Sequence, residues 1–291
     1  MLNFITWNVA PKLFSVGPLT VRWYGLMWGI GFLIGYEIIL RVFKHEKYPA
    51  EWADKIFVYM FVGTIIGARL GHCLLYEHWF DWADQTGLIH EGYVSHPWNL
   101  LKVWEGGLSS HGGAFGILIA MYFFNRNVSK KGYIWIFDRL VIAVAFTGAC
   151  IRFGNLMNSE IYGDPTTLPW GFRFIQNLNE WMAGAPPVYS LPSHPTQIYE
   201  MLYCLVSLGV TSFLFFKKKA YERRGLIFGT FLIIIFVTRF LLEFIKNIQS
   251  DFEKDMILNM GQLLSIPFII WGIWLFVNAL RKPRITSTEQ I

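Results

Sequence analysis

Long runs of apolar residues, separated by short polar or charged stretches, dominate the hydrophobic pattern of this chain. Seven of these runs have roughly the 20 residues that a helix needs to cross a bilayer. The pattern therefore predicts an all-α polytopic membrane protein with seven transmembrane helices, forming a single integral membrane domain over residues 1–291. The predicted spans lie at about 20–40, 54–76, 107–125, 134–153, 198–216, 225–246 and 261–280.

Basic residues gather in alternate loops between these runs. Lysines and arginines follow the first, third, fifth and seventh runs, as in Lys217, Lys218 and Lys219 after the fifth. The positive-inside rule places these loops in the cytoplasm, with the N-terminus outside and the C-terminus cytoplasmic. The loops at 77–106 and 154–197 hold few basic residues and many aromatic ones. We expect them to form a small external arm or head.

Composition supports a membrane protein and excludes several other classes. The chain is 54% hydrophobic and 15% charged, whereas soluble domains carry about 25% charged residues. The net charge of +5 comes with no nucleic-acid motif, so no nucleic-acid partner is expected. Cys73, Cys150 and Cys204 lie in apolar runs without a CxxC pair, and the histidines show no HExxH spacing. Neither a disulfide framework, a metal site nor a cofactor is predicted.

Polar side chains lie near one end of five of the runs. The predicted direction of each span puts all of these side chains in its outer half. A charged group at membrane depth is costly and persists mainly where it faces a cavity or an ion partner. Arginines that converge there favour a site for an anion, and a phosphate suits their paired N–H groups. The residues are Tyr24, Arg69, His72, Tyr76, His111, Arg152, Asn155, Arg239 and Glu243.

Simpler explanations exist for each of these residues alone. Arg239 and Glu243 could form an intrahelical ion pair, His111 could pack at a helix start, and Arg69 could extend to the headgroups. A channel or transporter for an anionic solute is an alternative function, but the predicted cytoplasmic halves, such as Phe115 to Phe124, are almost wholly apolar. A lipid-binding scaffold would explain the arginines and would leave His111 without a task.

Seven short segments carry a more specific signal. Of these, the stretch from Arg152 to Gly163 is the most specific. In content and order they resemble the prolipoprotein diacylglyceryl transferase family over nearly the whole chain. The segments are Trp23 to Met27, Gly67 to Gly71, Trp104 to Gly113, Arg152 to Gly163, His194 to Glu200, Arg239 with Glu243, and Met260 to Pro267.

The resemblance implies a reaction and its partners. The diacylglyceryl group of phosphatidylglycerol would pass to the lipobox cysteine of a preprolipoprotein signal peptide, forming a thioether and releasing glycerol phosphate. This is the first step of bacterial lipoprotein maturation. It implies a multi-pass protein of the bacterial cytoplasmic (inner) membrane, with its active site near the outer leaflet.

The resemblance also assigns roles to residues. Arg152 and Arg239 would hold the lipid phosphate, and His111 would assist deprotonation of the thiol, so these three are the expected catalytic residues. The expected substrate-binding residues are Arg152, Asn155, Asn158, Glu160, Gly163, Tyr24, Arg69, Glu243, His194, Gln197, Tyr199 and Glu200.

Two positions qualify this assignment. Ile235 stands where some family members carry a tyrosine, one turn before Arg239, so a hydroxyl role there would pass to Tyr24 or Tyr199. Cys150 lies two residues before Arg152 and invites a covalent enzyme intermediate. A thioether on that sulfur would be a poor leaving group, so we expect direct attack by the thiol of the substrate.

Overall fold

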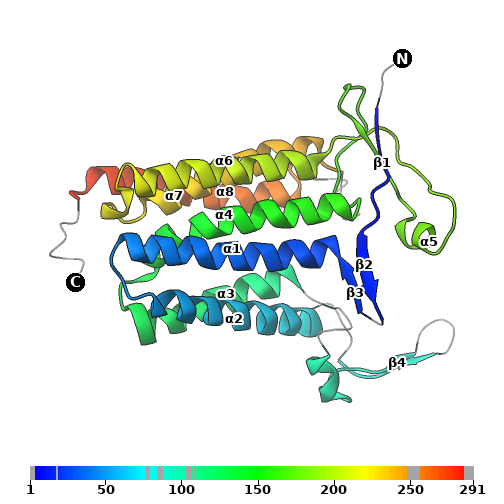
Figure 1. The fold of residues 1–291 in the computed structure, drawn as a ribbon, viewed down its shortest axis with the longest axis horizontal. Helices are drawn as coiled ribbons and strands as arrows, with labels where there is room; N and C mark the ends of the chain where they lie inside the picture. The colour runs from blue at the N-terminus through cyan, green and yellow to red at the C-terminus, as the bar shows by residue number, and fades with distance from the viewer. Residues whose placement is uncertain are drawn as a thin grey trace. The chain divides into compact units, whose positions relative to one another are not determined.

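The computed structural model describes residues 4–17, 19–75, 79–83, 88–102, 107, 109–247 and 256–284. Within these residues, six helices are long and apolar enough to cross a membrane. This confirms a mostly helical, polytopic membrane protein (Figure 1). The six are α1 (Trp23–His45), α2 (Glu51–Leu75), α4 (Tyr133–Met157), α6 (Thr196–Phe216), α7 (Leu226–Leu242) and α8 (Met260–Arg281).

The third expected span, at 107–125, is shorter in the structure. Its helix α3 (Ser110–Phe124) has 15 residues, and a π-helical turn, η3 (Asn125–Ser129), continues it. Fifteen residues rise only about 22 Å, less than the roughly 30 Å of a hydrocarbon core. A seventh crossing therefore stays a prediction. Tyr76 and the motif residues Trp104, Glu105, Gly106 and Leu108 lie outside the described residues.

The chain divides into two compact units. Unit one comprises Met1–Val42 with Phe137–Ile291, and unit two comprises Phe43–Ile136. The expectation of a single domain stays a prediction.

In unit one, α4 is the central helix. Its Thr147 hydroxyl donates a hydrogen bond to the Gly31 carbonyl of α1, at 3.1 Å. The next residue, Gly148, lies against the Cys204 sulfur of α6. Helices α7 and α8 pack on each other, and α6 packs on α7. These contacts bring the start of α6 and the end of α7 close to the end of α4.

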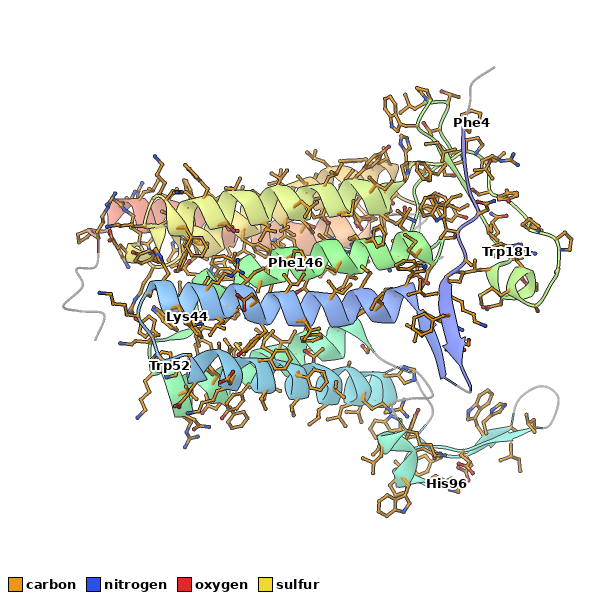
Figure 2. All side chains as sticks on the ribbon, in the orientation of Figure 1. Phe4, Lys44, Trp52, His96, Phe146 and Trp181 are labelled. Carbon is orange, nitrogen blue, oxygen red and sulfur yellow. The ribbon has the colours of Figure 1, made fainter. Side chains whose placement is uncertain are left out.

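Short strands surround this end of unit one. Strand β1 (Ile5–Trp7) pairs in parallel with β6 (Phe172–Phe174), and β2 (Lys12–Val16) pairs antiparallel with β3 (Leu19–Arg22). The Trp7 indole N–H donates to the Leu156 carbonyl at 2.9 Å, which caps the last turn of α4. The short helix α5 (Leu178–Met182) carries Trp181 (Figure 2). The expected loop at 154–197 is therefore an ordered layer that holds the end of α4.

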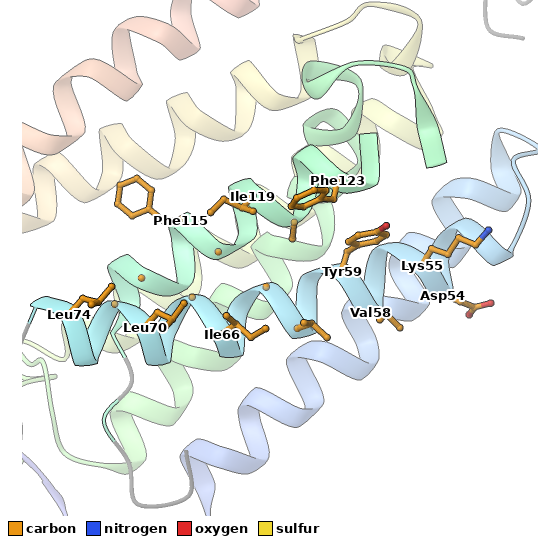
Figure 3. Close-up of a pocket in the computed structure, with 17 residues that line it drawn as sticks. Asp54, Lys55, Val58, Tyr59, Ile66, Leu70, Leu74, Phe115, Ile119 and Phe123 are labelled. Carbon is orange, nitrogen blue, oxygen red and sulfur yellow. The ribbon is translucent and has the colours of Figure 1, made fainter. Parts of the chain in front are cut away.

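Unit two is built on the helix pair α2 and α3. Glycines of the two helices face each other so closely that a Cβ atom at Gly67 would overlap the Gly112 carbonyl. Strands β4 (Trp82–Ala83) and β5 (Ile89–His90) and the 3-10 helix η1 (Pro97–Leu101) lie in the segment between the two helices. A groove of about 890 Å³ runs along the pair (Figure 3). Its lining is apolar apart from Asp54, Lys55 and Tyr59 near one end.

Candidate functional site

Five charged side chains form a chain of ion pairs in unit one. Arg152 Nε of α4 lies 2.8 Å from Glu200 Oε2 of α6. The other oxygen of Glu200 lies 3.3 Å from Lys246 Nζ, just past the end of α7. Lys246 Nζ is also 3.6 Å from Glu243 Oε1, and this oxygen is 3.6 Å from Arg239 Nε. The predicted ion pair of Arg239 and Glu243 is thus one link of a longer network.

Burial differs systematically along this network. The side chains of Glu200, Lys246 and Glu243 are 1%, 5% and 10% exposed, whereas those of Arg152 and Arg239 are 22% and 36% exposed. The carboxylates and the ammonium group therefore lie inside, and the two guanidinium groups reach outward. Buried charges of opposite sign compensate each other's desolvation, and the outward cations offer N–H groups to an anion.

An amide cluster adjoins Arg152. Arg152 Nη1 donates to Asn155 Oδ1 at 3.3 Å. The amide groups of Asn155 and Asn158 both donate to Glu160 Oε1, at 2.8 and 3.2 Å. Four of the predicted site residues therefore form one hydrogen-bonded group at the end of α4.

The backbone on both sides of Glu160 is strained and is held by hydrogen bonds from the start of α6. Its neighbours Ser159 and Ile161 have φ angles of 53° and 59°. A left-handed conformation is a genuine outlier for a β-branched residue such as isoleucine. Such strain persists only where the surroundings enforce it. Here the Gln197 amide donates to the Glu160 carbonyl and the Thr196 hydroxyl donates to the Ile161 carbonyl, at 2.6 and 2.8 Å.

Gly163 ends this turn where the backbone is tightly packed. Its N–H donates to the His194 carbonyl, and the next N–H, of Asp164, donates to the Ile245 carbonyl. A Cβ atom at Gly163 would overlap that Ile245 carbonyl and the methyl group of Thr196. Glycine is required because the backbone of the turn and the backbone after α7 approach without room for a side chain.

His194 and Tyr199 form a separate polar chain beside the turn. The Trp170 indole N–H donates to the Tyr199 hydroxyl at 3.0 Å, and this hydroxyl lies 3.3 Å from His194 Nδ1. Of the segment from His194 to Glu200, only Glu200 enters the ion-pair network. The rest braces the turn that carries Glu160.

Tyr24 and Ile235 have mainly packing contacts. The ring of Tyr24 lies against Gly154, one residue before Asn155. Ile235 packs on the apolar cluster of Ala149, Tyr203 and Cys204. An isoleucine therefore fits the surroundings at the position where some family members carry a tyrosine.

Arg69 and His111 belong to unit two. Arg69 is 6% exposed, and its guanidinium group donates to the carbonyls of Asn99, Leu100 and Gly107. These contacts give Arg69 a structural task in holding the segment between α2 and α3. His111 is exposed in the first turn of α3, after Ser109, whose hydroxyl accepts the Gly112 N–H.

Carboxylates brace the same segment of unit two. Asp81 accepts the Gly92 N–H at 2.7 Å, and this hydrogen bond holds the pKa of Asp81 below its usual value. Glu91 accepts the Asn99 amide at 2.8 Å, which lowers the pKa of Glu91. Both carboxylates are therefore ionised at neutral pH. Their bracing is lost only as the pH falls through these lowered pKa values.

Sequence reasoning missed two residues of the site. Lys246 follows Arg239 and Glu243 at the spacing i, i+4, i+7, which would place all three on one face of a continuous helix, so a signal is present in the sequence. In the structure the helix ends before Lys246, whose backbone is extended. Trp7 has no comparable signal, because its partner Leu156 is 149 residues away. Among the described residues, no group of three His, Cys, Asp or Glu side chains could hold a metal ion.

Comparison with known proteins identifies the family of the chain. Residues 11–278 match the model of the family described as prolipoprotein diacylglyceryl transferase. Three similar proteins are each named phosphatidylglycerol–prolipoprotein diacylglyceryl transferase. The protein from Porphyromonas gingivalis is 44% identical, with 96% of each chain covered. The protein from Chloroherpeton thalassium is 39% identical over 99% of this chain and 98% of its own length. The protein from Tolumonas auensis is also 39% identical, over 95% of this chain and 98% of its own length.

Proposed function

Because the chain belongs to the prolipoprotein diacylglyceryl transferase family, we propose that its ion-pair network is the phosphate site for diacylglyceryl transfer. The enzyme transfers the diacylglyceryl group of phosphatidylglycerol to a prolipoprotein. The acceptor atom is the thiol sulfur of the lipobox cysteine. The observation that carries this proposal is the pair of guanidinium groups, Arg152 and Arg239, aligned outward by buried carboxylates.

The chemistry explains why cations are needed. The thiolate sulfur attacks the glycerol CH₂ of the diacylglyceryl group, and a C–S bond forms as the C–O bond to the phosphate breaks. Glycerol phosphate leaves with the electron pair, so negative charge grows on the phosphate oxygens in the transition state. Preorganised cations aimed at that charge lower the barrier. Arg152 and Arg239 do this through N–H groups that face outward.

His111 takes the proton of the incoming thiol. Its place in the first turn of α3 supports this role, since the N-terminus of a helix favours negative charge and hence a thiolate nearby. The nucleophile is the cysteine of the substrate. Cys73, Cys150 and Cys204 are all buried, which suits a packing role rather than a covalent intermediate.

The headgroup pocket is formed by the amide cluster of Asn155, Asn158 and Glu160, with Gly163 and Tyr24 shaping its wall. In this proposal the site lies near the outer leaflet of the bacterial inner membrane. The apolar run at 107–125 is the seventh crossing, and the loops at 77–106 and 154–197 form the external arm. The alternation of basic loops supports this orientation.

A transfer assay on the purified protein tests the function directly. We expect lipobox peptide and phosphatidylglycerol in mixed micelles to give a diacylglyceryl thioether peptide and free glycerol phosphate in equal amounts. Mass spectrometry measures the peptide product and a coupled enzyme measures glycerol phosphate. A peptide with serine in place of the lipobox cysteine is the matched control. Absence of product from the wild type, or equal transfer to the serine peptide, would contradict the proposal.

A further inference from the structure

Lys246 is the most buried of the three cations in the network, and it contacts both carboxylates. Its side chain is 5% exposed, and its ammonium nitrogen lies 3.3 Å from Glu200 and 3.6 Å from Glu243. Each arginine, in contrast, contacts one of the two carboxylates. Lys246 is therefore the link between the Arg152 half and the Arg239 half of the site.

The backbone fixes Lys246 in this place. Gly163 and Lys246 form an antiparallel bridge, and the Asp164 N–H donates to the Ile245 carbonyl at 2.9 Å. The same turn carries Glu160 and its strained neighbours. The ammonium group is thus positioned by the segment that builds the amide cluster, rather than by a long flexible side chain alone.

Charge balance gives this position a consequence. The ion-pair network holds three cations and two carboxylates, so its ion pairs carry one net positive charge, while the nearby Glu160 carboxylate adds a negative charge to the site. Without Lys246, Glu200 and Glu243 would be balanced by Arg152 and Arg239 alone. Each buried carboxylate would then draw its arginine into a closer, bidentate pair, and the site would have one positive charge less to offer the anionic lipid.

We propose that Lys246 is a positioning residue for the transfer reaction. Its ammonium group compensates the negative charge of the Glu200 and Glu243 carboxylates from within the protein. Arg152 and Arg239 therefore keep their outward N–H groups free to bind the phosphate of the lipid. This inference rests on the proposed function. Lys246 is not a catalytic residue, because it acts through the arginines.

Three variants test this role. Lys246→Met keeps the unbranched side chain as far as its ε-carbon and removes the charge. We expect the KM for phosphatidylglycerol to rise by about 10- to 100-fold, as for loss of a hydrogen bond to a charged group. Lys246→Arg keeps the charge and should stay within about fivefold of the wild type. The double variant Lys246→Met with Glu243→Gln restores the net positive charge and leaves an oxygen for Arg239, so its KM should be lower than that of Lys246→Met.

The measurement is KM and kcat over a range of phosphatidylglycerol mole fractions in phosphatidylcholine micelles, with thermal unfolding as a check on folding. Lys217→Met, an exposed lysine at the far end of α6, is the control and should behave as the wild type. If Lys246→Met does not accumulate as folded protein, Lys246→Gln takes its place. The KM of Lys246→Gln should then exceed that of Lys246→Arg, and equal KM values would contradict the inference.

Several outcomes would overturn the inference. They are a Lys246→Met variant with wild-type KM, a Lys246→Arg variant as poor as Lys246→Met, and a double variant whose KM is no lower than that of Lys246→Met. Failure of the wild type to transfer would count against the proposed function instead. In that case, the binding of phosphatidylglycerol nanodiscs still tests the role of Lys246. Lys246→Met should bind them more weakly than the wild type, and equal affinity would contradict the inference.

Discussion

Arg152 has two partners at once: its Nε forms an ion pair with Glu200, and its Nη1 donates a hydrogen bond to Asn155. A planar guanidinium group can hold this geometry and still present an N–H group to a phosphate, whereas an ammonium group is a point charge. We therefore expect Arg152→Ala to abolish transfer and Arg152→Lys to lower kcat/KM by about 100-fold or more, the cost typical of losing an oxyanion donor. The assay is thioether formation at equal amounts of protein.

The control for this substitution is Arg173→Lys. Arg173 is exposed and lies over the ring of Tyr189 in the same unit, so its replacement should leave transfer unchanged. An Arg152→Lys enzyme with a near-normal rate would rule out a paired N–H contact with the phosphate.

His111 should matter for the chemical step rather than for lipid binding. A general base contributes about 10²- to 10⁴-fold, so His111→Gln should lower kcat by that range while phosphatidylglycerol affinity is retained. Single-turnover transfer and nanodisc binding measure the two effects separately. His45→Gln, at the end of α1, is the matched control. Equal loss of binding and turnover would show that His111 is structural.

Some of these residues could be predicted from the sequence and others could not. Arg239 and Glu243 share a helical face by spacing alone, and the structure joins them at 3.6 Å. Glu200 was predicted at the site only by resemblance, since its partner Arg152 lies on another helix. The buried Asp138 also has distant partners: it accepts the N–H groups of Gly225 and Phe228 at the start of α7. Such contacts depend on helix packing, which hydropathy does not encode.

At the scale of elements, the turn after α4 depends on Gly163. A methyl group there would displace the Ile245 carbonyl, and the bridge to Lys246 would move with it. We expect Gly163→Ala to lower transfer by about tenfold or more, since small displacements at a site can cost about 10²-fold. Gly209→Ala in α6, where a Cβ atom meets open space, should be neutral. Equal activity of the two variants, at equal thermal stability, would mean that the close approach at Gly163 is unimportant.

Hydropathy predicted the long helices better than the elements between them. Helix α4 begins within a residue of the predicted span and runs four residues further, to Met157, because the Asn155 turn continues the helix into the site. Strands β1 and β6 were not predicted, as three residues are too few to show an alternating pattern. The left-handed Ile161 runs against local preference and is held by distant partners.

At the scale of the whole molecule, the charge pattern makes a definite prediction of orientation. A cysteine probe at Ala183, in the predicted external loop, should react with a membrane-impermeant maleimide in intact cells. A probe at Lys218, between α6 and α7, should react only after permeabilisation, because the positive-inside rule places that loop in the cytoplasm. The three native cysteines are buried and give a low background. The reverse labelling pattern would overturn the orientation and the outer-leaflet site with it.

The pairing of β1 with β6, and of Trp7 with Leu156, sets the order in which the enzyme is completed during its synthesis. Trp7 precedes Leu156 by 149 residues. At about 5–20 residues per second, roughly 7–30 s of translation separate the two. The first strand must therefore wait for its partner while α1, α2, α3 and α4 are made, and the ion-pair network also needs Glu200, Arg239 and Lys246, which are made later still. A nascent chain halted before residue 172 therefore contains Arg152 and His111 but lacks Glu200, the ion-pair partner of Arg152.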